Sequence, residues 1–335
     1  MATKRNETEY MYASARIRFM ENRIASGERL SHLADAESSD NIVSVLPDLG
    51  FDVIHDEKGE LCREETLSTV LRQGYSEIEK MDCDTEFLKF LRYPYDCHNI
   101  KSLIKCFARG IDAKDMMIPL GSVEISELEK AFSSKKYSCL PSNMAKAAKE
   151  AEEAFGATAN PQKVDLILDK ACYADMLDNA DTCGVALAGK LVRAKIDLTN
   201  IISFVRLSMM KLGDSAPLLL AEALIEGGRL DTSFFKERFS AGVSKLSESL
   251  EFTDYSSICQ YLSGNISLGE LERAADSLWL KTAKEAKFVP FGAEVLIGYL
   301  AALEFEVKNI RILLAGKDAG LSAEVIRERL RESYV

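Results

Sequence analysis

Apolar residues recur along this chain at the three- and four-residue spacing of helices that face a core. In residues 291–314 one apolar stripe repeats in this way, and its members are Val295, Tyr299, Leu303, Ile310 and Leu313. The alternation of apolar and polar residues that marks a half-buried strand is nearly absent, apart from a short extended segment expected at Phe51–Ile54. The pattern predicts an all-α fold.

Capping signals mark the ends of several predicted helices. Glycine takes the left-handed conformation that ends a helix at little steric cost. Three such glycines follow apolar segments, and we interpret them as helix-terminating: Gly110, Gly213 and Gly320. Ser322 stands where the next helix would begin, and Ser267 with Glu270 has the spacing of a capping box. The predicted unit is therefore a helix, a glycine and a second capped helix.

A short motif occurs three times at long intervals. Each copy places an acidic residue three positions before an asparagine, which isoleucine follows; the pairs are Asp96 and Asn99, Asp197 and Asn200, and Glu306 and Asn309. Self-similarity at a regular spacing indicates repeated modules. We predict three similar helical modules packed around one another, over residues 1–110, 111–213 and 214–335.

A weaker copy opens the chain, where Arg16-Ile17 is followed at the same interval by Gly27 but the asparagine is missing. If this segment belongs to the set, each end of the chain carries part of one module. The C-terminal helices would then complete the first module, and the two chain ends would meet.

The three asparagines require a physical role, because asparagine is a mediocre helix former. A hydrogen bond to the acid three residues earlier, or to a neighbouring helix, would supply one. A contact with a partner protein is the alternative. We favour maintenance of the fold, since a buried polar group has to be satisfied.

Composition and charge narrow the function. The 335-residue chain is 47% apolar and 28% charged with a net charge of −11, and each third carries more acidic than basic residues. No segment offers the basic surface on which nucleic-acid binding depends, and an anionic membrane surface is disfavoured too. No apolar run reaches the length of a membrane span, so we expect no direct membrane insertion. Eight scattered cysteines without a CxxC pair, and an N-terminus unlike a signal peptide, indicate a reducing, cytoplasmic setting.

Two segments have residue patterns that are typical of a phosphate-binding loop or of a catalytic cysteine. Gly184–Lys190 reads GxxxxGK, but Leu191 replaces the Ser or Thr that a phosphate loop needs for magnesium, and no apolar strand precedes it. Cys97 and His98 suggest a thiol and its base, yet neighbours on a helix point about 100° apart. No second ligand stands at zinc spacing. We therefore expect no catalytic, cofactor-binding or metal-binding residues.

Several segments together resemble a known family over nearly the whole chain. They are Tyr12-Ala-Ser-Ala-Arg16-Ile-Arg18, Tyr93-Pro-Tyr-Asp96-Cys-His-Asn99-Ile-Lys101, Asp169-x3-Tyr173, Gly298-Tyr299, Glu306-Val-Lys-Asn309-Ile-Arg311, Gly316-Lys317 and Leu321–Leu330. They are similar to the C subunits of bacterial and archaeal V-type (A-type) ATPases, whose eukaryotic counterpart is called the d subunit.

The resemblance implies a funnel of three similar helical domains related by pseudo-threefold symmetry. It also implies a non-catalytic rotor protein of the central stalk, which receives the shaft made of the D and F subunits and sits on the membrane proteolipid ring. Such a protein is peripheral, on the cytoplasmic face, and serves ATP-driven or ATP-synthesising transport of protons or sodium. A cytosolic helical-repeat scaffold unrelated to rotary ATPases is the alternative, and a helical enzyme is a third interpretation that no residue cluster favours.

Overall fold

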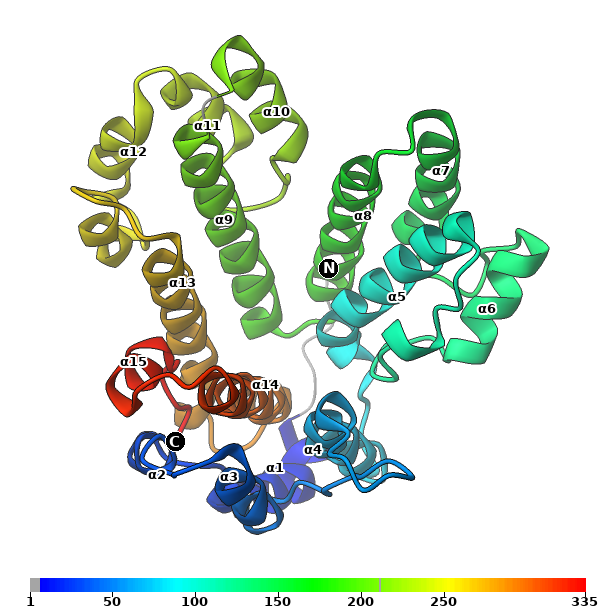
Figure 1. The fold of residues 1–335 in the computed structure, drawn as a ribbon, viewed down its shortest axis with the longest axis vertical. Coiled ribbons are helices and arrows are strands. Elements are labelled where there is room, and N and C mark those ends of the chain that lie inside the picture. The colour runs from blue at the N-terminus through cyan, green and yellow to red at the C-terminus, as the bar shows by residue number, and fades with distance from the viewer. Residues whose placement is uncertain (1–6, 211) are drawn as a thin grey trace. The chain divides into compact units, whose positions relative to one another are not determined.

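The chain folds into helices and the turns that connect them (Figure 1). The computed structural model describes residues 7–210 and 212–335, and within these residues it contains no strand, only one antiparallel bridge between His55 and Leu61. The extended segment predicted at Phe51–Ile54 leads into this bridge. The all-α prediction is confirmed for the described residues.

Two compact units divide the chain. One is Glu86–Ser249, and the other combines the described part of Lys4–Thr85 with Leu250–Val335. The unit Glu86–Ser249 is therefore inserted in the sequence between the two segments that form the other unit. The bounds of the three predicted modules stay a prediction.

Helix α8 is the centre of the unit Glu86–Ser249, because α5, α7 and α9 all pack against it, while α10 and α11 pack on α9. Asn160 caps its first turn by accepting from the backbone N–H of Gln162, and Pro161 occupies its first position. The α-helices of this unit are α5 (Lys89–Arg109), α6 (Ile125–Ser134), α7 (Ser142–Thr158), α8 (Pro161–Thr182), α9 (Ala186–Met209), α10 (Ala216–Ala223), α11 (Thr232–Phe239) and α12 (Gly242–Leu250). Its 3-10 turns are η4 (Glu86–Leu88), η5 (Lys114–Met116) and η6 (Gly213–Ser215).

Helix α14 is the core of the other unit. The predicted apolar stripe lies on α14 and is buried, but so are residues on its other sides, because α1, α3, α4 and α13 surround it. The α-helices of this unit are α1 (Met11–Met20), α2 (Gly27–Leu33), α3 (Ser39–Val45), α4 (Arg63–Glu79), α13 (Leu268–Ala283), α14 (Ala293–Asp318) and α15 (Ala323–Arg329). Its 3-10 turns are η1 (Glu7–Tyr10), η2 (Glu21–Arg23), η3 (Leu46–Leu49), η7 (Ser256–Tyr261) and η8 (Lys284–Phe288).

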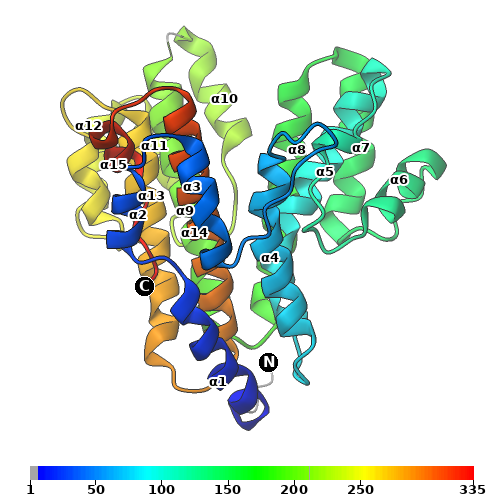
Figure 2. The same ribbon diagram turned by 60° about the horizontal axis from the view of Figure 1, so that its bottom comes forward.

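The N-terminal helices and the C-terminal helices lie together in this unit. Figure 2 shows α2 and α3 beside α14, and α1, α2 and α3 all contact it. Side chains join the two ends directly: Ser14 Oγ accepts from the backbone N–H of Gly292 at 3.1 Å, and Ser333 Oγ donates to the carbonyl of Ala25 at 2.7 Å. Segments from opposite ends of the sequence therefore share one core.

Candidate functional site

The first acid–asparagine pair fixes the segment that follows α5. Asp96 and Asn99 lie on α5 and are fully buried. Asn99 Nδ2 donates to the carbonyl of Ile118 at 2.9 Å, and its Oδ1 accepts from the N–H of Ile118 at 2.8 Å. The Asp96 carboxylate accepts from the N–H groups of Ser122 and Val123 at 2.9 and 3.1 Å, and from Ser122 Oγ. We call this arrangement an anchor.

The second pair repeats the arrangement on α9. Asn200 exchanges the same two hydrogen bonds with Ile225, at 2.8 and 2.9 Å. Asp197 accepts from the N–H groups of Arg229 and Leu230, at 2.9 and 3.1 Å. The anchor again joins a long helix to the chain that follows it, and both side chains are fully buried.

The third pair, on α14, differs at its acid. Asn309 exchanges two hydrogen bonds with Arg331, at 3.1 and 2.7 Å, and so holds the C-terminal segment. Glu306 Oε1 instead accepts from the N–H of Ala25 at 2.7 Å, which places the N-terminal segment on the same helix. The asparagines bond neither the acid three residues earlier nor a neighbouring helix. Each asparagine bonds the backbone of a non-helical segment.

Burial changes the proton affinity of these acids. Desolvation raises the pKa of Asp96 above its ordinary value, although the hydrogen bonds from Ser122 and Val123 oppose the shift. Desolvation raises the pKa of Glu306 to about 7, against the N–H of Ala25 and the positive charge of Arg29. Fewer donors reach Glu306, which explains why its charge is the less well stabilised.

Two glycines that the sequence reasoning missed make room for the anchors. A Cβ atom on Gly121 would lie 2.2 Å from Asp96 Oδ1, and one on Gly228 would lie 2.0 Å from Asp197 Oδ1. Each glycine immediately precedes the two N–H donors of its anchor. A glycine four residues before the next helix was the available signal, but its distance from the acid differs between the copies.

The three glycines interpreted as helix-terminating all have positive φ angles. Gly110 caps α5 in the left-handed conformation, and Gly320 follows α14 directly after its C-cap residue Ala319. Gly213 is different, because α9 ends at Met209 and Gly213 is the first residue of η6. It therefore begins a 3-10 turn instead of ending α9.

Asp175 on α8 forms a further polar contact that the sequence reasoning missed. Its carboxylate accepts from the N–H groups of Asn143 and Met144 at 2.9 and 2.8 Å, and from Asn143 Nδ2 at 2.9 Å. These donors belong to the first turn of α7, where N–H groups lack helical partners and favour a negative charge. Asp175 thus fixes the start of α7 on α8.

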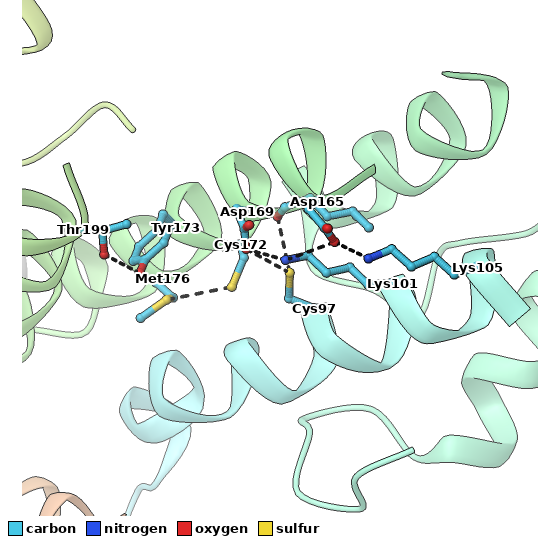
Figure 3. A network of polar contacts seen from close by, with 10 residues as sticks. Cys97, Lys101, Lys105, Asp165, Asp169, Cys172, Tyr173, Met176 and Thr199 are labelled. Atoms are coloured by element: carbon cyan, nitrogen blue, oxygen red, sulfur yellow. Dashed lines mark hydrogen bonds and ion pairs between the residues drawn. The ribbon is translucent and has the colours of Figure 1, made fainter. Parts of the chain in front are cut away.

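A network of polar side chains joins α5, α8 and α9 (Figure 3). Lys101 Nζ lies 2.6 Å from Asp169 Oδ1 and 3.9 Å from Asp165 Oδ1, and Lys105 Nζ lies 2.5 Å from the same Asp165 oxygen. Burial lowers the pKa of Lys101, but Cys97 and the two carboxylates outweigh it, and the net shift is upward. At the other end, the Tyr173 hydroxyl lies 3.0 Å from Thr199 Oγ1.

The structure places Cys97 and His98 on α5, and the GxxxxGK segment at the start of α9. Cys97 is buried, with Sγ 3.5 Å from the carbonyl of Leu168, whereas the exposed His98 ring lies 2.9 Å from the carbonyl of Met116. The two side chains thus have different neighbours. Gly184 lies in the turn between α8 and α9, so a helix precedes the GxxxxGK segment where a phosphate loop would follow a strand.

Within the described residues, no group of three or more His, Cys, Asp or Glu side chains is arranged to hold a metal ion. None of the helices in this part of the chain combines the length and the apolar character that a bilayer crossing needs.

Comparison with known proteins identifies the family. The sequence model of the ATP synthase (C/AC39) subunit matches residues 13–329. The chain belongs to this family. Its members are the C subunits of V-type and A-type ATPases, as the resemblance implied, and the match includes all three acid–asparagine pairs.

Relatives of the C/AC39 family align over nearly the whole chain. The C subunit of the A-type ATP synthase of Methanocaldococcus jannaschii is 26% identical over 344 residues, which cover 96% of this chain and 86% of the relative. The C subunit of the V-type sodium ATPase of Enterococcus hirae is 23% identical, with 97% of this chain and 99% of the relative covered. The corresponding A-type ATP synthase protein of Thermococcus onnurineus is also 23% identical, with 96% and 90% covered.

In this member of the C/AC39 family, the segments that carried the resemblance coincide with the polar contacts described above. Asp169 and Tyr173 belong to the network of Figure 3, and the segment from Tyr93 to Lys101 contains the first anchor. The segment Glu306–Arg311 contains the third. These family-like residues therefore hold helices and segments in place.

Proposed function

We propose that this chain is the rotor protein that couples the central shaft, made of the D and F subunits, to the membrane proteolipid ring of a V-type ATPase. The observation that carries the proposal is the family match over residues 13–329. The protein would be peripheral, on the cytoplasmic face of the membrane. It would serve ATP-driven or ATP-synthesising transport of protons or sodium.

The mechanism that we propose is mechanical and involves no catalysis by this chain. A coupling protein has to pass torque without deforming, and close-packed helical interiors resist deformation. The anchors support this role, because each fixes a non-helical segment to a long helix through the hydrogen bonds of buried side chains. Removing one of them would leave backbone groups unsatisfied, which makes slippage costly.

We further propose that the three anchors mark three similar modules that form a funnel with pseudo-threefold symmetry and receive the shaft in its opening. The recurrence of the same asparagine geometry at Ile118, Ile225 and Arg331 supports this arrangement. The bounds remain those expected from the repeat, namely residues 1–110, 111–213 and 214–335.

Purification of the tagged chain from native membranes in a mild detergent tests the proposed function. We expect the proteolipid and the soluble ATPase subunits to elute with it, D and F among them. An untagged strain, processed in parallel, controls for non-specific retention. A cytosolic scaffold would instead remain in the supernatant without ATPase subunits, and that result would refute the proposal.

A further inference from the structure

A cavity lies between α1, α4 and α14. Its volume is about 340 Å³, and its apolar walls include Val70 on α4 and Leu303 on α14. Two buried polar side chains of α14, Tyr299 and Glu306, also line it. They stand seven residues apart, hence on the same face of the helix and about 10 Å apart along its axis. The cavity therefore has a polar group near each end of an apolar wall.

Glu306 has fewer hydrogen bonds than its counterparts in the other anchors. Asp96 and Asp197 each accept from two successive backbone N–H groups. Glu306 is 3% exposed, and the one donor that the described residues offer it is the N–H of Ala25, which bonds Oε1. Its second oxygen has no donor among them. This oxygen is not fully buried and is open to the cavity.

Tyr299 has the same feature at the other end of the wall. Its side chain is 5% exposed, and the described residues provide no hydrogen bond to its hydroxyl. Buried tyrosine hydroxyls usually find a partner. Neither the Tyr299 hydroxyl nor the second Glu306 oxygen is fully buried, so both are open to the cavity, where a bound molecule can complete their hydrogen bonds.

The charges around the cavity place the negative group at Glu306. Arg16 and Glu77, which both line the cavity, form an ion pair with each other. Arg23 lies at the rim with its side chain exposed, and Arg29 on α2 acts on Glu306 only through its charge. None of these cations donates a hydrogen bond to the Glu306 carboxylate. A ligand with its own N–H donors can therefore bind there.

We propose that this cavity binds a primary alkylammonium group, whose N–H donors bond the second oxygen of Glu306 and whose alkyl chain packs on Val70 and Leu303. A polar group at the far end of a longer ligand would reach the Tyr299 hydroxyl. The alkylammonium group can belong to a free small amine or to a lysine side chain of another protein in the assembly. The first source needs only this chain, and the second rests on the proposed function.

Calorimetric titration of the purified chain with n-pentylammonium tests the site directly. Hydrogen bonds to charged groups are worth about 1.5–3 kcal/mol, so we expect pentyltrimethylammonium, which has no N–H, to bind at least about tenfold more weakly. Binding should also weaken by at least about tenfold in Glu306→Gln and, for the natural chain, between pH 8.5 and pH 5.5, because a protonated carboxyl loses its charge. Glu65→Gln, at an exposed position of α4 outside the cavity lining, is the control and should retain binding.

Carbodiimide coupling in the purified assembly separates the two sources. A cross-link from Glu306 to a lysine of another protein would assign the group to that protein, whereas a small amine recovered from the denatured assembly would assign it to a free ligand. Equal binding of the primary and quaternary amines, or no binding of either to the natural chain, would overturn the proposal. Neither result depends on whether Glu306→Gln folds, and neither bears on co-purification with the ATPase.

Discussion

The side-chain amide of Asn99 hydrogen-bonds both backbone groups of Ile118, donating to its carbonyl at 2.9 Å and accepting from its N–H at 2.8 Å. This pairing reproduces what a neighbouring strand would offer, in a protein whose described residues contain no strand. The same exchange links Asn200 to Ile225 and Asn309 to Arg331. In all three places, asparagine thus satisfies the N–H and the carbonyl of one residue in a non-helical segment.

Replacing Asn200 by Leu should destabilise the chain strongly. The change keeps the side-chain volume roughly constant but leaves the N–H and the carbonyl of the buried residue Ile225 without partners. Each such group costs about 1–3 kcal/mol, so we expect the free energy of unfolding to fall by about 2–6 kcal/mol in urea denaturation. Asn265→Leu, at an exposed loop position, is the control and should change it by less than about 0.5 kcal/mol. Equal effects of the two variants would argue against the anchor.

Replacing Gly228 by Ala tests the close approach of the backbone to Asp197. The new Cβ would lie 2.0 Å from the carboxylate oxygen, so the carboxylate has to move away from its N–H donors. Overpacking of this kind costs about 1–3 kcal/mol, measurable as a lower midpoint of thermal unfolding. Gly27→Ala, where a Cβ meets nothing within 4 Å, should leave the midpoint nearly unchanged. A midpoint for Gly228→Ala that matches this control would contradict the geometry.

The stability of the chain should depend on pH through Glu306. Its pKa is raised from 4.5 to about 7 in the fold, so the native state holds the proton more tightly than the unfolded state. A raised pKa contributes stability that is complete below the unfolded value and is lost as the pH rises through about 7. Relative to Glu306→Gln, we expect the natural chain to lose about 2–3 kcal/mol of unfolding free energy between pH 5 and pH 8. Other titrating groups cancel in this difference, and a constant difference across that range would be inconsistent with the burial of Glu306.

Replacing Lys101 by Met should have a small effect, despite the short distance between Lys101 and Asp169. The Asp169 side chain is 46% exposed, so water can solvate its carboxylate once the ammonium is gone. Methionine also retains most of the buried aliphatic chain. We expect a change in unfolding free energy of less than about 1 kcal/mol in chemical denaturation. A loss above about 3 kcal/mol would mean that the network behaves as a buried ion pair.

The sequence indicated the helices and the acid–asparagine pairs but not what the pairs contact. Helix periodicity and caps are local, and α14 with its following Ser322 cap was predicted from them. The partners of the asparagines are separated from them by 19, 25 and 22 residues, so no constant spacing reveals them. Glu306 bonds Ala25 across 281 residues, and only tertiary packing brings these segments together. Gly213 shows the limit of the cap signal, because a glycine after an apolar run can also begin a 3-10 turn.

Parallel measurement of ATP hydrolysis and ATP-driven ion uptake tests the coupling role most directly. Vesicles carrying the proteolipid ring are reconstituted with the soluble ATPase subunits, with and without this chain. We predict that hydrolysis persists in both preparations, while ion uptake requires the chain and returns when it is added back. Ion uptake at the same rate without the chain would refute the coupling role.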